Sequence, residues 1–154
     1  MRLINSLKSR RDSEEGFTLI ELMVVVLIIA ILIAIAIPTF LGARERAQDR
    51  AAQSDLRNGL TAEKVYYTDE EAYADASVAA ELASLQAIEP SLDWNGDLTA
   101  NVTGATAQQV CLEQDSASGT TFAVADIATG VDAGTYYNRG ACAAVVTGWE
   151  QDGW

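Results

Sequence analysis

The segment GFTLIELMVVVLIIAILIAIAIPTFL, residues 16–41, decides the fold of this 154-residue chain. Positions 22–37 contain neither a charged nor a hydroxyl side chain, which favours a helix in lipid or among other apolar helices. As a helix, residues 17–41 would extend over roughly 37 Å, enough to cross a bilayer. One carboxylate, Glu21, lies directly before the apolar run. Ionised groups are costly there and often mark function, so Glu21 is a candidate functional residue.

The residues after the apolar run predict that the helix continues. Between 42 and 68 the pattern is amphipathic, with a stripe formed by Ala52, Leu56, Leu60 and, one turn later, Val65. We therefore expect one helix over 17–68, apolar all round in its first half and apolar on one stripe in its second.

Pro38 lies late in the apolar run. It cannot donate a backbone hydrogen bond to the carbonyl of Ala34, and it disfavours helix at Ile37. We expect a helix break or a bend at Pro38.

The rest of the chain predicts a small α+β domain. Residues 69–97 are acidic and rich in Ala, with a short helix over 77–88 that the Glu89-Pro90 pair ends. Beyond them, runs rich in Val, Thr, Phe and Tyr alternate with Gly, Asn and Asp, which favours an antiparallel sheet packed on the amphipathic half of the long helix. The predicted strands are 98–103, 109–113, 121–127, 135–137 and 141–147.

The expected organisation therefore has five parts. They are a polar leader at 1–16, an apolar helix at 17–41, its amphipathic continuation at 42–68, a connecting region at 69–97 and a sheet region at 98–154. An apolar helix that uses the first third of the chain leaves room for a single domain.

Composition argues against several classes of function. Ten basic residues against 22 acidic ones leave a net charge of −12, which disfavours nucleic-acid binding. The sequence contains no His, so Ser-His, Cys-His and His-zinc sites cannot be built from it. We expect no enzyme activity, no cofactor and no direct nucleic-acid partner.

Two cysteines, Cys111 and Cys142, lie in the part of the chain that should be exported. An even pair in an oxidising compartment predicts a disulfide, with two unrelated buried thiols as the alternative. Such a bridge would contribute roughly 3–4 kcal/mol if chain entropy dominates.

The string Gly16-Phe17-Thr18-Leu19-Ile20-Glu21, followed by the apolar run, resembles the N-terminus of type IV pilins and their pseudopilin relatives. In that family prepilin peptidase, a membrane aspartyl protease, cuts on the cytoplasmic side after the glycine and methylates the new amino terminus. The resemblance implies cleavage between Gly16 and Phe17 and N-methylation of Phe17. Glycine suits the cleavage position because it lets an extended backbone approach the protease closely.

The resemblance also implies an orientation. Basic residues flank both ends of the apolar run in nearly equal number, so the positive-inside rule alone does not decide it. A pilin precursor would cross the cytoplasmic membrane once, with 1–16 inside and the chain from Gly42 onward outside. With the help of a pilus assembly platform protein it would then join a homo-oligomeric surface filament.

For Glu21 the resemblance implies a pair with the N-terminal amine of a neighbouring subunit, which relieves the cost of a carboxylate in an apolar setting. A pair with the subunit's own terminus and a solvated position at the membrane interface are the alternatives. At Pro38, filaments of this family often unwind the helix that leads to such a proline. A simple kink is the alternative there.

The predicted function is that of a structural subunit of a type IV pilus, serving adhesion, motility or DNA uptake. A pseudopilin of a type II secretion or competence machine is the alternative, and the cysteine pair favours the pilin. A DNA-binding minor pilin or adhesin would need a basic patch, yet Arg139 is the only cation after Lys64.

A weaker pattern suggests calcium. Asp93, Asn95 and Asp97 place oxygen ligands at alternating positions, as a calcium loop does. The position of the glycine, and Gly104 where a closing Glu should be, exclude an EF-hand. A looser calcium site and a plain Asn-Gly turn are the two interpretations.

Overall fold

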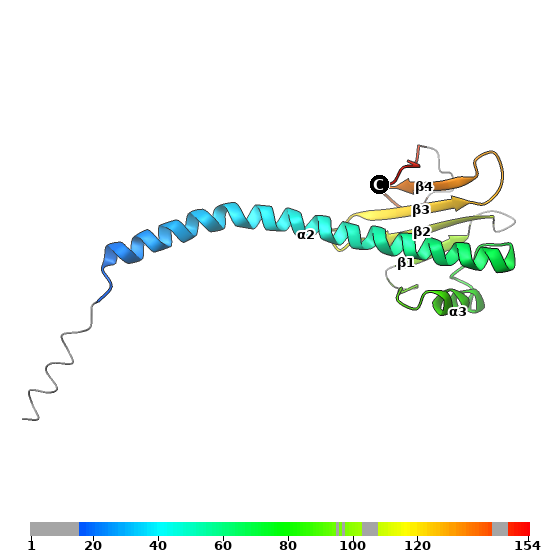
Figure 1. The fold of residues 1–154 in the computed structure, drawn as a ribbon, viewed down its shortest axis with the longest axis horizontal. Coiled ribbons are helices and arrows are strands. Elements are labelled where there is room, and N and C mark those ends of the chain that lie inside the picture. Colours follow the sequence, from blue (N-terminus) through cyan, green and yellow to red (C-terminus); the bar gives the residue numbers. More distant parts are fainter. Residues whose placement is uncertain (1–15, 95, 97, 103–107, 143–147) are drawn as a thin grey trace, which may run out of the picture. The chain divides into compact units, whose positions relative to one another are not determined.

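The structure, a computed structural model, describes residues 16–94, 96, 98–102, 108–142 and 148–154, with the backbone alone at 100–102. The chain divides into two compact units, Met1–Gly42 and Ala43–Trp154. The elements are α2 (Leu19–Glu70), α3 (Ala79–Ile88), β1 (Leu98–Val102), β2 (Gln109–Asp115), β3 (Thr121–Ile127) and β4 (Gly134–Asn138). A long N-terminal helix followed by an antiparallel sheet confirms the predicted α+β class (Figure 1).

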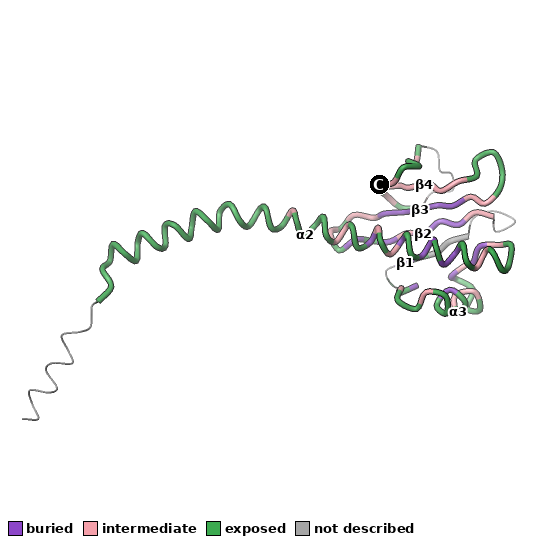
Figure 2. The backbone as a smooth tube through the Cα atoms, viewed as in Figure 1, coloured by how far each residue is buried: buried purple, intermediate pink, exposed green. Residues whose placement is uncertain are grey.

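The first unit contains the apolar part of α2, and all its described residues from 16 to 41 are exposed (Figure 2). Exposed fractions of its large apolar side chains run from 48% at Val24 to 84% at Phe17. So large an apolar surface on a soluble monomer would be unusual, and it marks a membrane or protein contact.

In the second unit, α2 buries one stripe against the sheet. The buried residues of the helix are Ala52, Leu56, Gly59, Leu60, Ala62 and Glu63. The prediction for Ala52, Leu56 and Leu60 is confirmed, but the one for Val65 is wrong, because this side chain is 45% exposed. Five residues after Leu60, Val65 points about 140° away from it around the helix axis.

Gly59 explains how closely the helix approaches the sheet. A Cβ atom at this position would lie 2.9 Å from Leu98 Cδ2 and 3.3 Å from Leu112 Cδ1. A glycine inside a helix costs about 1 kcal/mol relative to alanine. Here that cost is offset by close packing of α2 on β1 and β2.

The sheet has the order β1-β2-β3-β4, with every neighbouring pair antiparallel. The prediction for 121–127 matches β3. The predictions for 98–103, 109–113 and 135–137 agree with β1, β2 and β4 to within two residues. Most of the expected strand at 141–147 lies outside the described residues. The chain returns to β4 as a single bridge between Tyr137 and Glu150.

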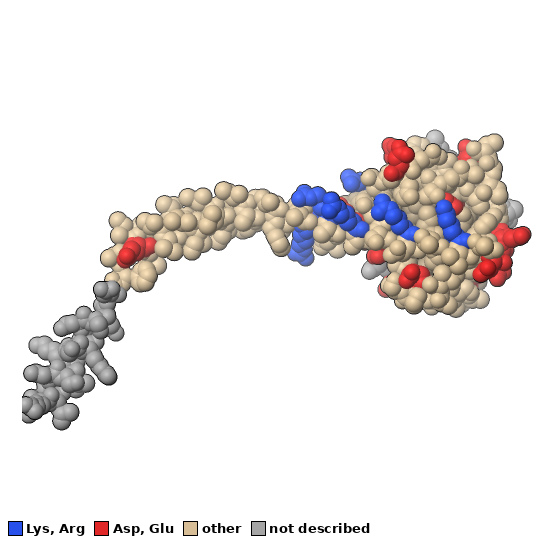
Figure 3. All heavy atoms as spheres, viewed as in Figure 1, with Lys and Arg blue, Asp and Glu red and all other residues tan. Residues whose placement is uncertain are grey.

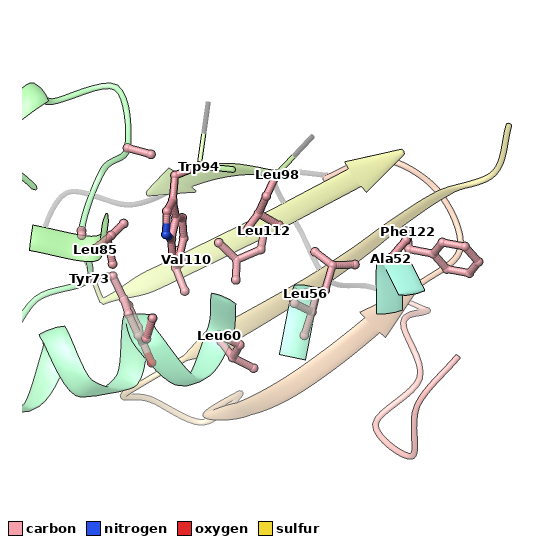
Figure 4. Close-up of a cluster of buried hydrophobic side chains, with 14 residues drawn as sticks. Ala52, Leu56, Leu60, Tyr73, Leu85, Trp94, Leu98, Val110, Leu112 and Phe122 are labelled. Atoms are coloured by element: carbon pink, nitrogen blue, oxygen red, sulfur yellow. The ribbon is translucent and has the colours of Figure 1, made fainter. Parts of the chain in front are cut away.

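The two faces of the sheet bury different segments. Val110, Leu112, Phe122 and Val124 pack with α2, Leu85 and Trp94 in the main core (Figure 4). On the opposite face, Cys111, Ala123 and Ala125 are covered by Cys142 and Trp149. The predicted disulfide between Cys111 and Cys142 is present, with their Cα atoms 6.0 Å apart. It fastens the C-terminal segment to the outer face of the sheet.

A buried carboxylate, Asp126 on β3, joins several elements. Lys64 on α2 forms an ion pair with it, with 2.9 Å between Nζ and Oδ1. The hydroxyl groups of Tyr73 and Thr135 donate hydrogen bonds to the same carboxylate. Burial, together with the bond to Asp126, raises the pKa of the Tyr73 phenol. Removing one partner would leave buried polar groups unpaired, so the network should be sensitive to single substitutions.

Asp49 forms a second polar link between α2 and the sheet. Its Oδ1 accepts hydrogen bonds from the hydroxyl groups of Ser116 at 2.8 Å and Ser118 at 2.5 Å, in the turn between β2 and β3. The bond from Ser118 is the main cause that lowers the pKa of Asp49. This contact lies one turn before Ala52, the first buried residue of α2.

Glu63 is a carboxylic acid inside the core. Its Oε2 accepts the backbone N–H of Ala74 at 3.0 Å, while its Oε1 has no partner among the described residues. Burial raises the pKa of Glu63 from 4.5 to about 8, and the nearby carboxylates of Glu81 and Asp75 act in the same direction. The side chain is therefore protonated in the folded state at neutral pH.

The raised pKa of Glu63 predicts a pH-dependent stability. Between about pH 4.5 and 8 the folded state binds a proton at Glu63 that the unfolded state has released, so the free energy of unfolding falls as pH rises through this window. Glu63→Gln should flatten that decline and stabilise the fold at pH 8 by on the order of 3 kcal/mol. Chemical denaturation of the full chain in detergent at pH 5 and pH 8 measures both values. Glu113→Gln, at a partly buried acid on β2 that does not act on Glu63, is the control, because Gln still accepts the bond from the Cys142 N–H. Equal pH dependence in wild type and Glu63→Gln would contradict the prediction.

Candidate assembly site

Gly16 and Phe17 precede α2 and have no regular secondary structure. A Cβ atom built on Gly16 would meet nothing within 4 Å among the described residues. Packing in this part of the chain therefore does not require a glycine at position 16. Phe17 is 84% exposed, so the bond between the two residues is open to another protein.

Thr18 and Glu21 form a capping box at the start of α2. The Thr18 backbone N–H and hydroxyl donate hydrogen bonds to Glu21 Oε2 at 2.9 and 2.6 Å. In return the Glu21 N–H donates to Thr18 Oγ1 at 3.2 Å. This reciprocal arrangement satisfies backbone donors that the first helical turn leaves without partners.

The capping box fixes where the Glu21 carboxylate lies. It holds the side chain back over the N-terminal end of α2, where the helix dipole favours a negative charge. No basic side chain of the described residues forms an ion pair with it. The charge of Glu21 is thus oriented by the helix but is not neutralised by it.

Glu21 was predicted from the sequence as a site residue, but the role of Thr18 was not. A Ser or Thr followed three residues later by Glu, directly before an apolar run, is the signature of a capping box. That signal is present at 18–21 and could have predicted the contact.

The apolar segment of α2 meets the requirements for a membrane span. Its most apolar window of 18 residues has a mean hydropathy of 3.3, and none of it is buried within the chain. Of the helices that the structure describes, this one is long and apolar enough to cross a bilayer.

The helix continues through Pro38 without interruption, and the expected break or bend at this residue stays a prediction. Although Pro38 lacks a donor for Ala34, one missing bond in a helix of 52 residues leaves the neighbouring turns intact. The hydroxyl of Thr39 also donates to the Ile35 carbonyl at 3.0 Å, within the same turn. Unwinding in an assembled filament stays a prediction.

Two of the three calcium candidates, Asn95 and Asp97, lie outside the described residues. The third, Asp93, has its carboxylate against Gly96, where a Cβ atom would approach Asp93 Oδ2 to 2.1 Å. The part of the chain that is described contains no group of three or more His, Cys, Asp or Glu residues that could hold a metal ion. The calcium loop stays a prediction.

Comparison with known proteins finds similarity over the same N-terminal part of the chain. The family profile of the prokaryotic N-terminal methylation motif matches residues 11–37, which include the capping box. The type IV major pilin protein PilA of Myxococcus xanthus is 47% identical over 60 residues, which cover 39% of this chain and 27% of that protein. The chain thus matches about a quarter of the length of that relative.

A second relative covers most of both chains. The type IV wide pilus major component PilA4 of Thermus thermophilus is 32% identical over 117 residues, which cover 76% of this chain and 85% of that protein. No solved structure matches the chain significantly.

The capping box predicts a measurable effect of Thr18. Thr18→Val removes the hydroxyl that both donates to Glu21 and accepts from it, so the first turn should fray at a cost of about 1 kcal/mol. We expect amide exchange at Glu21 and Leu22 to become about fivefold faster in the full chain in detergent micelles, measured by NMR. Thr39→Val, which removes a hydroxyl bond inside the same helix, should leave these two amides unchanged. Unaltered exchange in Thr18→Val would contradict the capping role.

Proposed function

The chain belongs to the type IV pilin family, and we propose that it is the repeating structural subunit of a surface pilus. The observation that carries the proposal is an apolar helical segment that is exposed throughout, with one oriented carboxylate at its start that forms no ion pair among the described residues. Such a segment is stable in lipid before assembly and among identical helices after it. The two relatives named above are both described as major components of type IV pili, which supports this role.

The precursor is proposed to enter the cytoplasmic membrane with residues 1–16 inside. Prepilin peptidase would cut between Gly16 and Phe17 and methylate the amine of Phe17, and a platform protein would then extrude the subunit into the filament. The match to the methylation motif and the exposed bond at Gly16 support this order of events. Adhesion, motility and DNA uptake are the proposed uses of the filament, and none of them needs catalysis by the chain itself.

Glu21 is proposed to pair with the methylated amine of Phe17 in a neighbouring subunit. Its carboxylate is costly at the end of an apolar helix, and a cation from the next subunit lowers that cost. The capping box supports this proposal because it holds the carboxylate at the N-terminal end of α2 before a partner arrives.

Pro38 is the proposed point at which α2 loosens during assembly. Because it lacks a backbone donor for the carbonyl of Ala34, the helix has one hydrogen bond fewer here than elsewhere. Local loss of helix would let the apolar segments of neighbouring subunits adjust their packing.

Electron microscopy of cells that express the chain, with mass spectrometry of sheared filaments, tests the proposed function. We expect surface filaments whose main component begins at N-methylated Phe17. Gly16→Val should block processing, because a β-branched side chain prevents the close approach that glycine allows. Val131→Ala, at an exposed position, is the control and should leave processing unchanged. Short periplasmic assemblies without surface filaments would favour the alternative, a pseudopilin.

The role of Glu21 is tested by two substitutions. Glu21→Ala removes both charge and cap, whereas Glu21→Gln keeps an acceptor for Thr18 and removes only the charge. We expect both variants to be cleaved normally and to form about tenfold fewer filaments, since an unpaired buried amine costs several kcal/mol. Filament counts by microscopy and the N-terminal mass of the membrane-bound subunit are the readouts. Normal piliation in Glu21→Gln would rule out charge pairing.

A further inference from the structure

The second unit has a row of cations along one side of α2. Its members, called the basic row here, are Arg46, Arg50, Arg57 and Lys64. Their spacings of four and seven residues place them on one face of the helix. Figure 3 shows Lys and Arg side chains following α2 in this way.

Contacts place the basic row over the β3 and β4 side of the sheet. Lys64 Nζ reaches Asp126 on β3 and Thr135 on β4. The guanidinium of Arg57 lies 4.9 Å from the centre of the Trp154 ring, and the indole N–H of Trp154 donates to the carbonyl of Asn138 at the end of β4.

The first two cations of the row have no counter-ion among the residues that the structure describes. Arg46 and Arg50 are exposed, and neither forms an ion pair or a hydrogen bond among the described residues. The nearest acids along the helix are Glu45 and Asp49. Asp49 is already held by Ser116 and Ser118, and Glu45 forms no ion pair with either arginine among the described residues. The charges of Arg46 and Arg50 are therefore available to another molecule.

The opposite side of the same unit is acidic. Asp55 comes two residues before Arg57 and so points about 160° away from it around the helix. It accepts a hydrogen bond from Gln114 on β2 at 3.2 Å, and with Asp93 it lines a small hollow beside Leu98 of β1. Glu89 is held nearby through its bonds to Ser91. Asp55, Glu89 and Asp93 are called the acidic edge here.

We propose that the basic row of one subunit docks against the acidic edge of a second copy of this chain. The sequence has one cation after Lys64, Arg139, and its guanidinium lies over the Phe122 ring. Among the described residues, none of the three acids of the acidic edge forms an ion pair. Two complementary surfaces on opposite sides of one subunit make a head-to-tail contact, and a repeated head-to-tail contact that does not close produces a helical filament. The inference rests on the proposed function and adds a lateral, charge-based contact between the sheet-bearing units to the apolar packing of the helices.

Matched charge reversals on α2 test the contact in cells that make filaments. Arg50→Glu places a negative charge in the basic row, opposite the acidic edge of the neighbour, and should reduce surface filaments by about tenfold. Arg44→Glu makes the same change one to two turns earlier on a face about 120° away and should leave filament yield close to wild type. Equal yields from Arg50→Glu and wild type would overturn the inference.

A double exchange of charge provides a second test of the contact between the basic row and the acidic edge. Arg46→Glu with Arg50→Glu, and separately Glu89→Lys with Asp93→Lys, should each lower filament yield, whereas all four substitutions in one chain restore complementarity and should raise the yield again. Processed subunit in the membrane and an oxidised Cys111–Cys142 pair report that each variant folds. If the four-fold variant folds but assembles no better than the double variants, the contact is wrong.

The same variants also test whether the basic row binds a different partner. Sheared wild-type and Arg46→Glu/Arg50→Glu filaments are incubated with vesicles containing anionic phospholipid and with duplex DNA. Unchanged filament yield together with lost binding to either probe would overturn the inference in favour of that partner. Absence of filaments from the wild-type chain would overturn the proposed function itself, while normal wild-type filaments with insensitive variants would overturn only the lateral contact.

Discussion

The exposed apolar half of α2 is the constraint on which the rest of the molecule depends. A helix of this hydropathy cannot remain in water, and the described residues of its own unit leave it exposed throughout. The chain must therefore exchange one apolar environment for another, lipid for neighbouring helices, without passing through solvent. Because lipid tails and helices of Leu, Ile and Val are similarly apolar, that exchange involves little hydrophobic free energy. Polar groups at the ends of the segment can then determine when the exchange of lipid for neighbouring helices occurs.

The second half of α2 meets a different requirement, and its sequence changes accordingly. It buries a narrow stripe on the sheet, approaches closest at Gly59, and is held at its two ends by Asp49 and by the pair of Lys64 with Asp126. The disulfide then fixes the C-terminal segment on the other face of the sheet. The sheet-bearing unit is thus stabilised by contacts of its own, which lets it keep one fold in the precursor and in a filament.

Patterns of single residues predicted the fold where burial follows simple periodicity. The apolar run and the stripe at Ala52, Leu56 and Leu60 predicted α2, and turn residues between apolar runs predicted the strands. The prediction that failed depended on context, since Val65 is apolar but lies off the stripe. At Pro38 the helix continues, and the expected break or bend stays a prediction. The burial of Glu63, which lies on the buried stripe three residues after Leu60, could not be predicted from the local sequence. It depends on a hydrogen bond from Ala74, which belongs to a later segment.

At the candidate assembly site, Glu21 was recognisable because a carboxylate is costly in an apolar setting. The role of its partner Thr18 was not predicted, although the spacing of the two residues indicates it.

In the proposed assembly, Glu21 has two successive partners with different demands, Thr18 in its own chain and the amine of a neighbouring subunit. As a cap, its Oε2 accepts two bonds from Thr18, and this arrangement needs only the helix itself. A neighbouring amine brings a full positive charge, which a carboxylate in an apolar setting binds more strongly than it binds neutral donors. A carboxylate has acceptor sites on both oxygens, so the second partner can be added without removing the first. The helix would then keep its first turn intact while its charge is neutralised, and the cost of ordering the Glu21 side chain has already been met before subunits meet. Preorganisation of this kind favours assembly without adding any contact to the finished filament.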